Sequence, residues 1–133
     1  ALPISSGPGY ASWQSANGPT TQTLDLDHDN DGVSNGIEYF LGGNTNTTGF
    51  TALPGVTNTA GILSVTWTKA ASYTGTYGTD FWVETSATLA NPWTNQSADP
   101  TPGFTVTFPS ANEVKYTFPA GTRNFARLKV TGP

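Results

Sequence analysis

The sequence predicts a mainly β protein, an antiparallel β-sandwich preceded by two short helices that flank a single acidic loop. From residue 62 onward, apolar and polar residues alternate with the period of two expected for half-buried strands. Before residue 44, apolar residues instead recur at helical spacing. Carboxylates are rare in the chain, yet they gather between residues 25 and 38. The chain therefore divides into a short helical part and a longer β part.

Composition limits both the number of domains and the classes of partner. With 133 residues, the chain is long enough for one domain with a core and too short for two ordinary ones. Charged residues make up 11% and the net charge is -4, so nucleic acid is not an expected partner. The sequence has no run of about twenty apolar residues, so no membrane span is expected.

The expected location is outside the cell. A low content of charge with many Thr, Ser, Asn and Gly residues is typical of secreted β proteins. The chain contains 0 Cys, so no disulfide is available and a bound ion is the staple that remains. Because it contains 0 Met and starts with Ala1-Leu2-Pro3, we expect a mature chain from which a signal peptide has been removed.

Residues 1–9 are predicted to form an extended arm. They carry two prolines and two glycines, which exclude a regular helix. Leu2 and Ile4 are the large apolar residues of the arm and the candidates for contact with a neighbouring subunit. The remaining residues, 10–133, are expected to form the single domain.

Two segments on either side of the acidic loop are predicted as short helices, and together with the loop they span residues 10–43. In the first, residues 10–17, Tyr10 and Trp13 recur at helical spacing and a Gly-Pro pair follows as a stop signal. In the second, residues 36–43, three apolar residues fall on one face and two glycines end the segment. These three residues are Ile37, Phe40 and Leu41.

The acidic loop has the spacing of a calcium site. From residue 27, the pattern D-x-D-x-D-G-x-x-N-x-x-E fills every required position of the EF-hand loop. Calcium is a hard cation that binds about six to eight oxygens, so alternate residues of a tight loop must turn their oxygens inward. We therefore expect one structural calcium ion. The predicted ligands are Asp27, Asp29, Asp31, the backbone carbonyl of Val33, Asn35 through its amide or a bridging water, and Glu38.

Strands are predicted between residues 62 and 130. Residues 62–68 and 81–85 form the first two, 104–108 and 114–118 form a hairpin, and 124–130 form the last strand. Turn signals recur between the strands and no helical period returns, so an antiparallel sandwich is the simplest architecture. The residues expected to face the core are Leu63, Val65 and Trp67 in the first strand and Ala126, Leu128 and Val130 in the last.

The segment 44–61 is predicted as a long surface loop with room for one short strand near residues 55–59. It contains an Asn-x-Thr sequon at Asn46, and a second sequon begins at Asn95. Both asparagines are candidate glycosylation sites, although a pattern of three residues often occurs by chance.

Four stretches share features with a known module: residues 10–13, residues 27–43, residues 83–86 with Leu89 and Trp93-Thr94, and residues 125–128. They resemble a module found at the carboxyl ends of many secreted and cell-surface proteins of environmental bacteria. The loop also resembles the solitary loops of dockerins and thrombospondin type 3 repeats, because Ser34 stands where paired EF-hands carry an aliphatic residue. The resemblance implies a calcium-binding, β-rich and non-catalytic module.

Three classes of function remain to be compared. An enzyme is not expected, because the acidic residues outside the loop are scattered along the chain. The preferred prediction is a subunit that polymerises with copies of itself into an extracellular filament or surface layer. It is favoured by the arm, by aromatic residues on both faces of residues 81–83 and by the few charges that would protect strand edges. The alternative is a carbohydrate-binding or adhesion module that contacts a polysaccharide or another partner through Tyr73, Tyr77 and Trp82.

Overall fold

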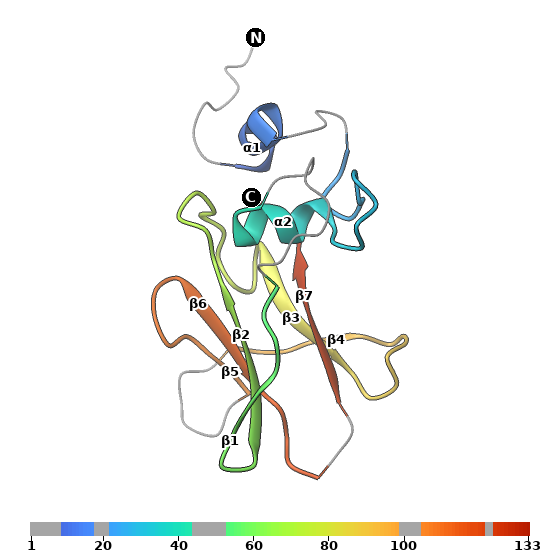
Figure 1. The fold of residues 1–133 in the computed structure, drawn as a ribbon, viewed down its shortest axis with the longest axis vertical. Coiled ribbons are helices and arrows are strands. Elements are labelled where there is room, and N and C mark those ends of the chain that lie inside the picture. The colour runs from blue at the N-terminus through green and yellow to red at the C-terminus, as the bar shows by residue number, and fades with distance from the viewer. Residues whose placement is uncertain (1–8, 18–21, 44–52, 99–104, 122–123) are drawn as a thin grey trace.

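The structure of the protein, a computed structural model, is mainly β with two short helices (Figure 1). It describes residues 9–17, 22–43, 53–98, 105–121 and 124–133. The helices are α1 (Tyr10–Asn17) and α2 (Asn35–Leu41), and the strands are β1 (Thr57–Thr59), β2 (Ile62–Thr68), β3 (Phe81–Ser86), β4 (Thr94–Asn95), β5 (Val106–Thr107), β6 (Glu113–Thr117) and β7 (Phe125–Val130). The predicted mainly β class and both predicted helices are confirmed.

The strands form two antiparallel sheets. One has the order β1-β2-β6-β5 and the other has the order β4-β3-β7. The longest pairing joins β3 and β7, with Phe81 opposite Val130 at one end. The predicted hairpin is present as β5 and β6, where Val106 lies opposite Tyr116, but β5 has only two residues.

The inner faces of the two sheets contribute to one core. In β7 the predicted alternation is confirmed, since Leu128 and Val130 are buried while Arg127 and Lys129 are exposed. The core residues from the strands are Val65, Trp67, Val106, Val114 and Tyr116 in the first sheet and Phe81, Val83, Leu128 and Val130 in the second.

The start of β2 differs from the prediction. Leu63, expected in the core, is 42% exposed, and its neighbour Ser64 is buried. Leu63 lies in the second position of β2, beside the β1–β2 turn, where it lines an open groove together with Phe125 and Ala126 of β7. The hydroxyl of Ser64 is satisfied by the hydroxyl of Thr57, at 3.2 Å across the β1–β2 pair.

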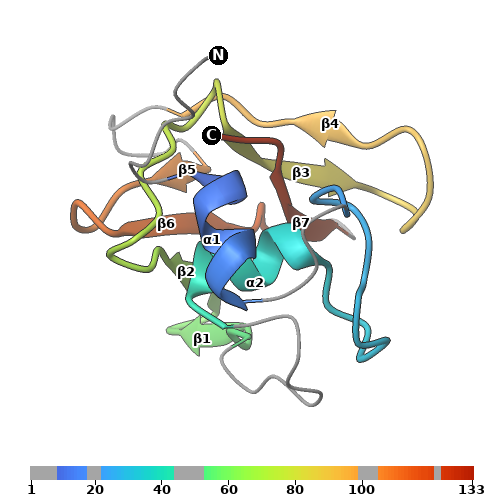
Figure 2. The same ribbon diagram turned by 90° about the horizontal axis from the view of Figure 1, so that it is seen from above.

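Both helices lie at one end of the two sheets (Figures 1 and 2). Tyr39 and Phe40 of α2 are completely buried there. Aromatic rings link the helices to the core. The distance between ring centroids is 5.4 Å for Trp13 and Tyr39, 4.9 Å for Tyr39 and Tyr73, and 4.9 Å for Phe40 and Phe81. Such ring pairs stabilise beyond the area that they bury, so the helices are fixed to the sheets by aromatic packing.

The last residues of the chain are bound to the same end. The N–H of Tyr10 donates to the carbonyl of Pro133 at 2.8 Å, and the N–H of Gly132 donates to the carbonyl of Asp80 at 3.0 Å. The hydroxyl of Tyr73 donates to the carbonyl of Gly132. Segments far apart in the sequence therefore meet at the helical end.

Some predictions fall on residues outside the described ranges. These are the arm with Leu2 and Ile4, apart from Gly9, and the sequon at Asn46. Asn95, the other candidate for glycosylation, is exposed in β4. Neither helix in the described part of the chain is long and apolar enough to cross a membrane.

Candidate metal centre

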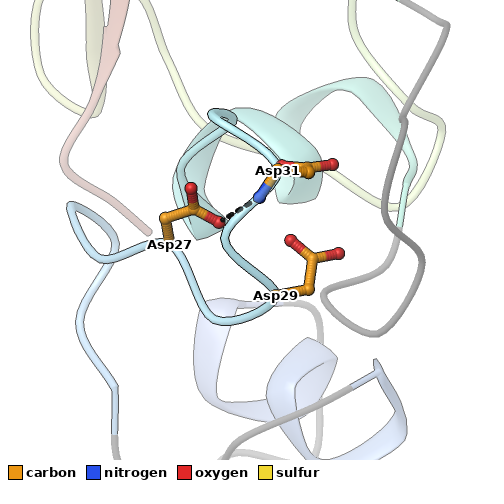
Figure 3. Close-up of side chains that lie close together, drawn as sticks. All are labelled: Asp27, Asp29 and Asp31. Carbon is orange, nitrogen blue, oxygen red and sulfur yellow. Dashed lines mark hydrogen bonds between the residues drawn. The ribbon is translucent and has the colours of Figure 1, made fainter.

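Three aspartates meet in the loop that leads into α2. One carboxylate oxygen from each of Asp27, Asp29 and Asp31 lies within 4.8 Å of the others, and Figure 3 shows the three side chains around one turn of the loop. Two oxygens that bind the same calcium ion at about 2.3–2.6 Å can be at most about 5 Å apart. The spacing of these three carboxylates is therefore compatible with one shared ion.

The aspartates also hold the loop in shape. The carboxylate of Asp27 accepts from the N–H of Asp31 at 3.3 Å and from the N–H of Gly32 at 2.8 Å. The carboxylate of Asp31 accepts from the N–H of Val33 at 2.9 Å. Gly32 has a φ of 92°, a left-handed conformation that favours glycine, which explains why the turn needs Gly at this position.

Glu38 lies in the first turn of α2, near enough for the charges of the three aspartates to act on it, but its oxygens are not part of the group that lies within 4.8 Å. Its side chain is fully buried, and neither carboxylate oxygen has a hydrogen-bond partner. Burial, together with the negative charges of Asp29, Asp31 and Asp27, raises the pKa of Glu38 to about 8. An uncompensated carboxylate in such a place costs several kcal/mol in its charged form.

Asp29 is in a similar situation. Both of its carboxylate oxygens are shielded from solvent and form no well-aligned hydrogen bond, although the Asp31 backbone lies near enough to lower its pKa and the Asp27 carboxyl near enough to raise it. Loss of hydration raises the pKa of Asp29, and the charge of Asp31 adds to this effect. The protein thus compensates both carboxylates poorly, which is compatible with a bound cation.

The donor atoms indicate which cation fits. Carboxylate oxygens are the ligands of hard divalent cations, whereas thiolates and imidazoles are typical of softer metals. The chain has no Cys, and its single His, His28, has an exposed side chain next to Asp27. The residues therefore fit calcium as predicted, and calcium binding itself stays a prediction.

Asn35 and Val33 take specific positions in the loop. Asn35 is buried, and its amide oxygen accepts from the N–H of His28 at 3.2 Å. Its amide nitrogen donates to the side-chain oxygen of Gln22 at 3.1 Å and to the carbonyl of Thr23 at 3.3 Å. Asn35 thus connects the entry of the loop to its exit. The ligand roles predicted for Asn35 and for the carbonyl of Val33 remain predictions.

Two residues that position Glu38 were not identified from the sequence. Ser34 is the N-cap of α2, where its hydroxyl accepts from the N–H of Ile37 at 3.4 Å. A serine directly before an apolar helical segment is a known signal for a cap. Gly36 faces Leu24, and a Cβ at Gly36 would lie 3.0 Å from the Leu24 carbonyl oxygen. No local signal predicts this contact, because it joins the helix to an earlier segment.

The residues predicted to contact a glycan or another partner are mostly engaged inside the protein. Tyr73 is only 3% exposed, which corrects the expectation of a surface contact. Its ring folds over Gly75, where a Cβ would lie 2.5 Å from the Tyr73 Cζ, so the glycine provides the space for burial. The Tyr77 hydroxyl donates to the carbonyl of Gln96 at 2.7 Å. Trp82 is half-buried.

Comparison of the chain with protein-family models, with curated proteins and with solved structures finds no match. The resemblance to carboxy-terminal modules of bacterial surface proteins therefore stays a prediction from the sequence. The candidate metal centre is supported by the geometry and burial of its own residues.

Proposed function

We propose that this protein is a secreted, calcium-stabilised structural domain that acts by associating with copies of itself. In this proposal, the two sheets form a β-sandwich and one calcium ion fastens the helical end to it. The bound ion supplies the positive charge that offsets the repulsion among four carboxylates. The ligands are Asp27, Asp29, Asp31 and Glu38, together with the carbonyl of Val33 and with Asn35 directly or through water. No catalytic role is assigned.

The observation that carries the calcium proposal is the state of the Glu38 carboxylate. Acidic surface loops are common without ions, but their carboxylates remain hydrated. Glu38 is instead 0% exposed and without a hydrogen-bond partner, beside three further carboxylates. Its place in the sequence is that of the last ligand in the EF-hand pattern. Both observations support an ion bound between the aspartates and α2.

The next residues of α2 explain how an ion would stabilise the whole domain. Glu38 is followed directly by Tyr39 and Phe40, whose rings pack against Tyr73 and Phe81 of the core. A ligand at Glu38 therefore fixes the rotation of the helix that carries these rings. Because the site forms only when the chain folds, the free energy of ion binding adds to the free energy of folding.

Self-association is supported by the surface of the β part. β1 and β5 are edges of one sheet in the described residues, and β4 and β7 are edges of the other. Edge strands present unpaired backbone groups that can pair with another chain. Six large apolar side chains among the described residues from residue 53 onward are at least 42% exposed. Clustered exposed apolar residues mark interaction surfaces.

An extracellular location follows from the kind of ion site that we propose. Solitary extracellular calcium modules bind with dissociation constants of about 10⁻⁴–10⁻³ M, which suits millimolar calcium. Polysaccharide binding is kept as the alternative partner chemistry. It loses support from Tyr73 and Tyr77, because one ring is buried and the other hydroxyl is used internally.

Calorimetric titration with calcium tests the ion site. The wild type should bind one ion, and the double variant Asp29→Ala, Glu38→Gln should show no binding heat. Asp25→Asn is the matched control, because Asp25 is exposed and lies in the same acidic stretch but outside the ligand pattern. This control should bind calcium normally. Heat that persists in the double variant would refute the ion site.

Sedimentation velocity with calcium present tests the second half of the proposal. We expect the sedimentation coefficient of the wild type to rise with protein concentration. A single monomeric species at all concentrations would refute self-association and leave the ion site untouched.

A further inference from the structure

Exposed apolar side chains are concentrated in one groove of the protein. Of the seven large apolar residues that are at least 42% exposed in the described residues, four line a groove of about 660 Å³. No charged residue is among the described residues that line it. The four exposed residues are Val56, Ile62, Leu63 and Leu89, and Phe118 and Phe125 also line the groove. The groove therefore suits an uncharged, apolar partner.

The groove and the helices lie at opposite ends of the sheets. Its walls include the start of β2 in one sheet and the start of β7 in the other. Figure 1 shows the β1–β2 turn and the β6–β7 connection at the end of the sheets away from α1 and α2. Gly9, where the arm joins the domain, is at the helical end, because the N–H of the next residue, Tyr10, binds the carbonyl of Pro133.

We infer that this groove binds residues 1–8 of a second copy of the chain, an inference that rests on the proposed self-association. The segment Ala-Leu-Pro-Ile-Ser-Ser-Gly-Pro carries no charged side chain, like the groove. Leu2 and Ile4 are two residues apart, so an extended segment presents both side chains on one face. Pro3 between them restricts the free segment and lowers the entropy lost on docking.

The length of the arm leaves little slack for Ile4 to reach the groove of the same molecule. Ile4 is five residues before Gly9, so an extended chain carries it at most about 18 Å from that point. β7 runs from Phe125 in the groove to Val130 near the helices, a rise of about 17 Å for strand geometry. The distance from Val130 to the helical end is added to this rise. A neighbouring copy can bring its groove to the arm without this constraint, which favours docking between copies.

An arm at one end and a groove at the other give a head-to-tail contact. Such a contact uses two different surfaces, and when its rotation does not close into a ring it continues as a filament. Val56 of the groove directly precedes β1, which pairs only with β2 in the described residues. The outer edge of β1 can therefore pair with the backbone of the incoming arm, as in strand addition.

Two full-length variants test the contact. The arm variant, Leu2→Asp with Ile4→Asp, retains the groove, and the groove variant, Ile62→Asp with Leu89→Asp, retains the arm. Each variant alone should self-associate at least about tenfold more weakly than the wild type, because two apolar side chains lose their buried partner surface. Mixed together, they should form a 1:1 complex that does not grow, since one intact arm meets one intact groove. Sedimentation velocity measures both results.

The control is Leu53→Asp, which makes the same change at an exposed leucine outside the groove and should leave self-association unchanged. If the wild type self-associates but the mixed variants form no complex, the arm-to-groove contact is wrong while self-association stands. If the wild type forms only dimers and the arm variant forms the same dimers, two grooves face each other, which also overturns the inference. A wild type that remains monomeric overturns the proposed function itself.

Discussion

The helical end and the groove end of this molecule both hold side chains in an unfavourable environment, but the two environments are opposite. At the helical end, the carboxylate of Glu38 is buried without a hydrogen-bond partner, and the charges of three aspartates act on it. At the groove end, apolar side chains such as Leu89, 63% exposed, lie in water. A buried charge and an exposed apolar cluster are both unfavourable in an isolated chain. This difference is why we propose different partners for the two ends, a cation for the first and an apolar segment for the second.

Removal of calcium should have the largest effect, and only through the helical end. If free calcium exceeds the dissociation constant a hundredfold, binding stabilises the fold by about 2.7 kcal/mol, equivalent to a rise in Tm on the order of 10 °C for a domain of this size. Thermal unfolding followed by circular dichroism should show this loss on chelation. Chelation should lower the Tm of the groove variant Ile62→Asp, Leu89→Asp by the same amount, because both substitutions lie outside the ion site. If the melting curve of the wild type does not change when chelator is added, no stabilising ion is bound at the helical end.

The parts of the fold that the sequence predicted correctly depend on neighbouring residues. The spacing from Asp27 to Asp31 brings three carboxylates together within one turn, and the alternation in β7 gives its buried and exposed faces. The parts that it missed depend on distant contacts. Tyr73 is buried because the ring fits over Gly75 and its hydroxyl reaches Gly132, and no local pattern encodes that arrangement.

The groove was missed for a related reason. Period-two alternation places Leu63 on the core face of its strand, but alternation says nothing about where the opposite sheet ends. Leu89 follows β3 in a connection, outside any regular period. Burial at both residues depends on the extent of the second layer, which only the assembled fold determines.

The substitution Gly75→Ala should have the next largest effect, on the packing of the helical end. The new Cβ would lie 2.5 Å from Cζ of Tyr73, a ring that is fixed between Tyr39 and Phe40. Overpacking of this kind typically lowers the free energy of unfolding by about 1–3 kcal/mol. Urea denaturation measures this loss. Gly55→Ala is the control, since nothing lies within 4 Å of its added Cβ, and an equal loss there would disprove the packing argument.

A separate effect is expected from pH in the absence of calcium. The pKa of Glu38 is raised from 4.5 to about 8, so the folded state holds its proton over a range where the unfolded state has lost it. The contribution of Glu38 to stability is therefore complete below pH 4.5 and decreases as the pH rises toward 8. With chelator present, the Tm of the wild type should fall across this range relative to Glu38→Gln, whose side chain does not titrate.

The matched variant in this pH experiment is Asp25→Asn, which removes a carboxylate from the same acidic stretch outside the cluster. It should keep the wild-type pH dependence in chelator, because Glu38 remains. With excess calcium, the wild type should become more stable than Glu38→Gln, so the order of the two proteins reverses at high pH. An unchanged order with and without calcium would mean that Glu38 does not bind the ion.

The smallest effect on stability should come from the groove end. Ile62 and Leu89 are 58% and 63% exposed, so replacing either with serine removes little buried apolar area and should change the unfolding free energy by less than about 0.5 kcal/mol. The measurement is urea denaturation at a concentration low enough to keep the chain monomeric. Val65→Ser, in the same strand but buried, should instead cost about 2 kcal/mol or more, because it leaves a cavity and an added hydroxyl in the core. Equal losses at Ile62 and Val65 would show that the groove end is part of the core, and it would then have no surface left for a partner.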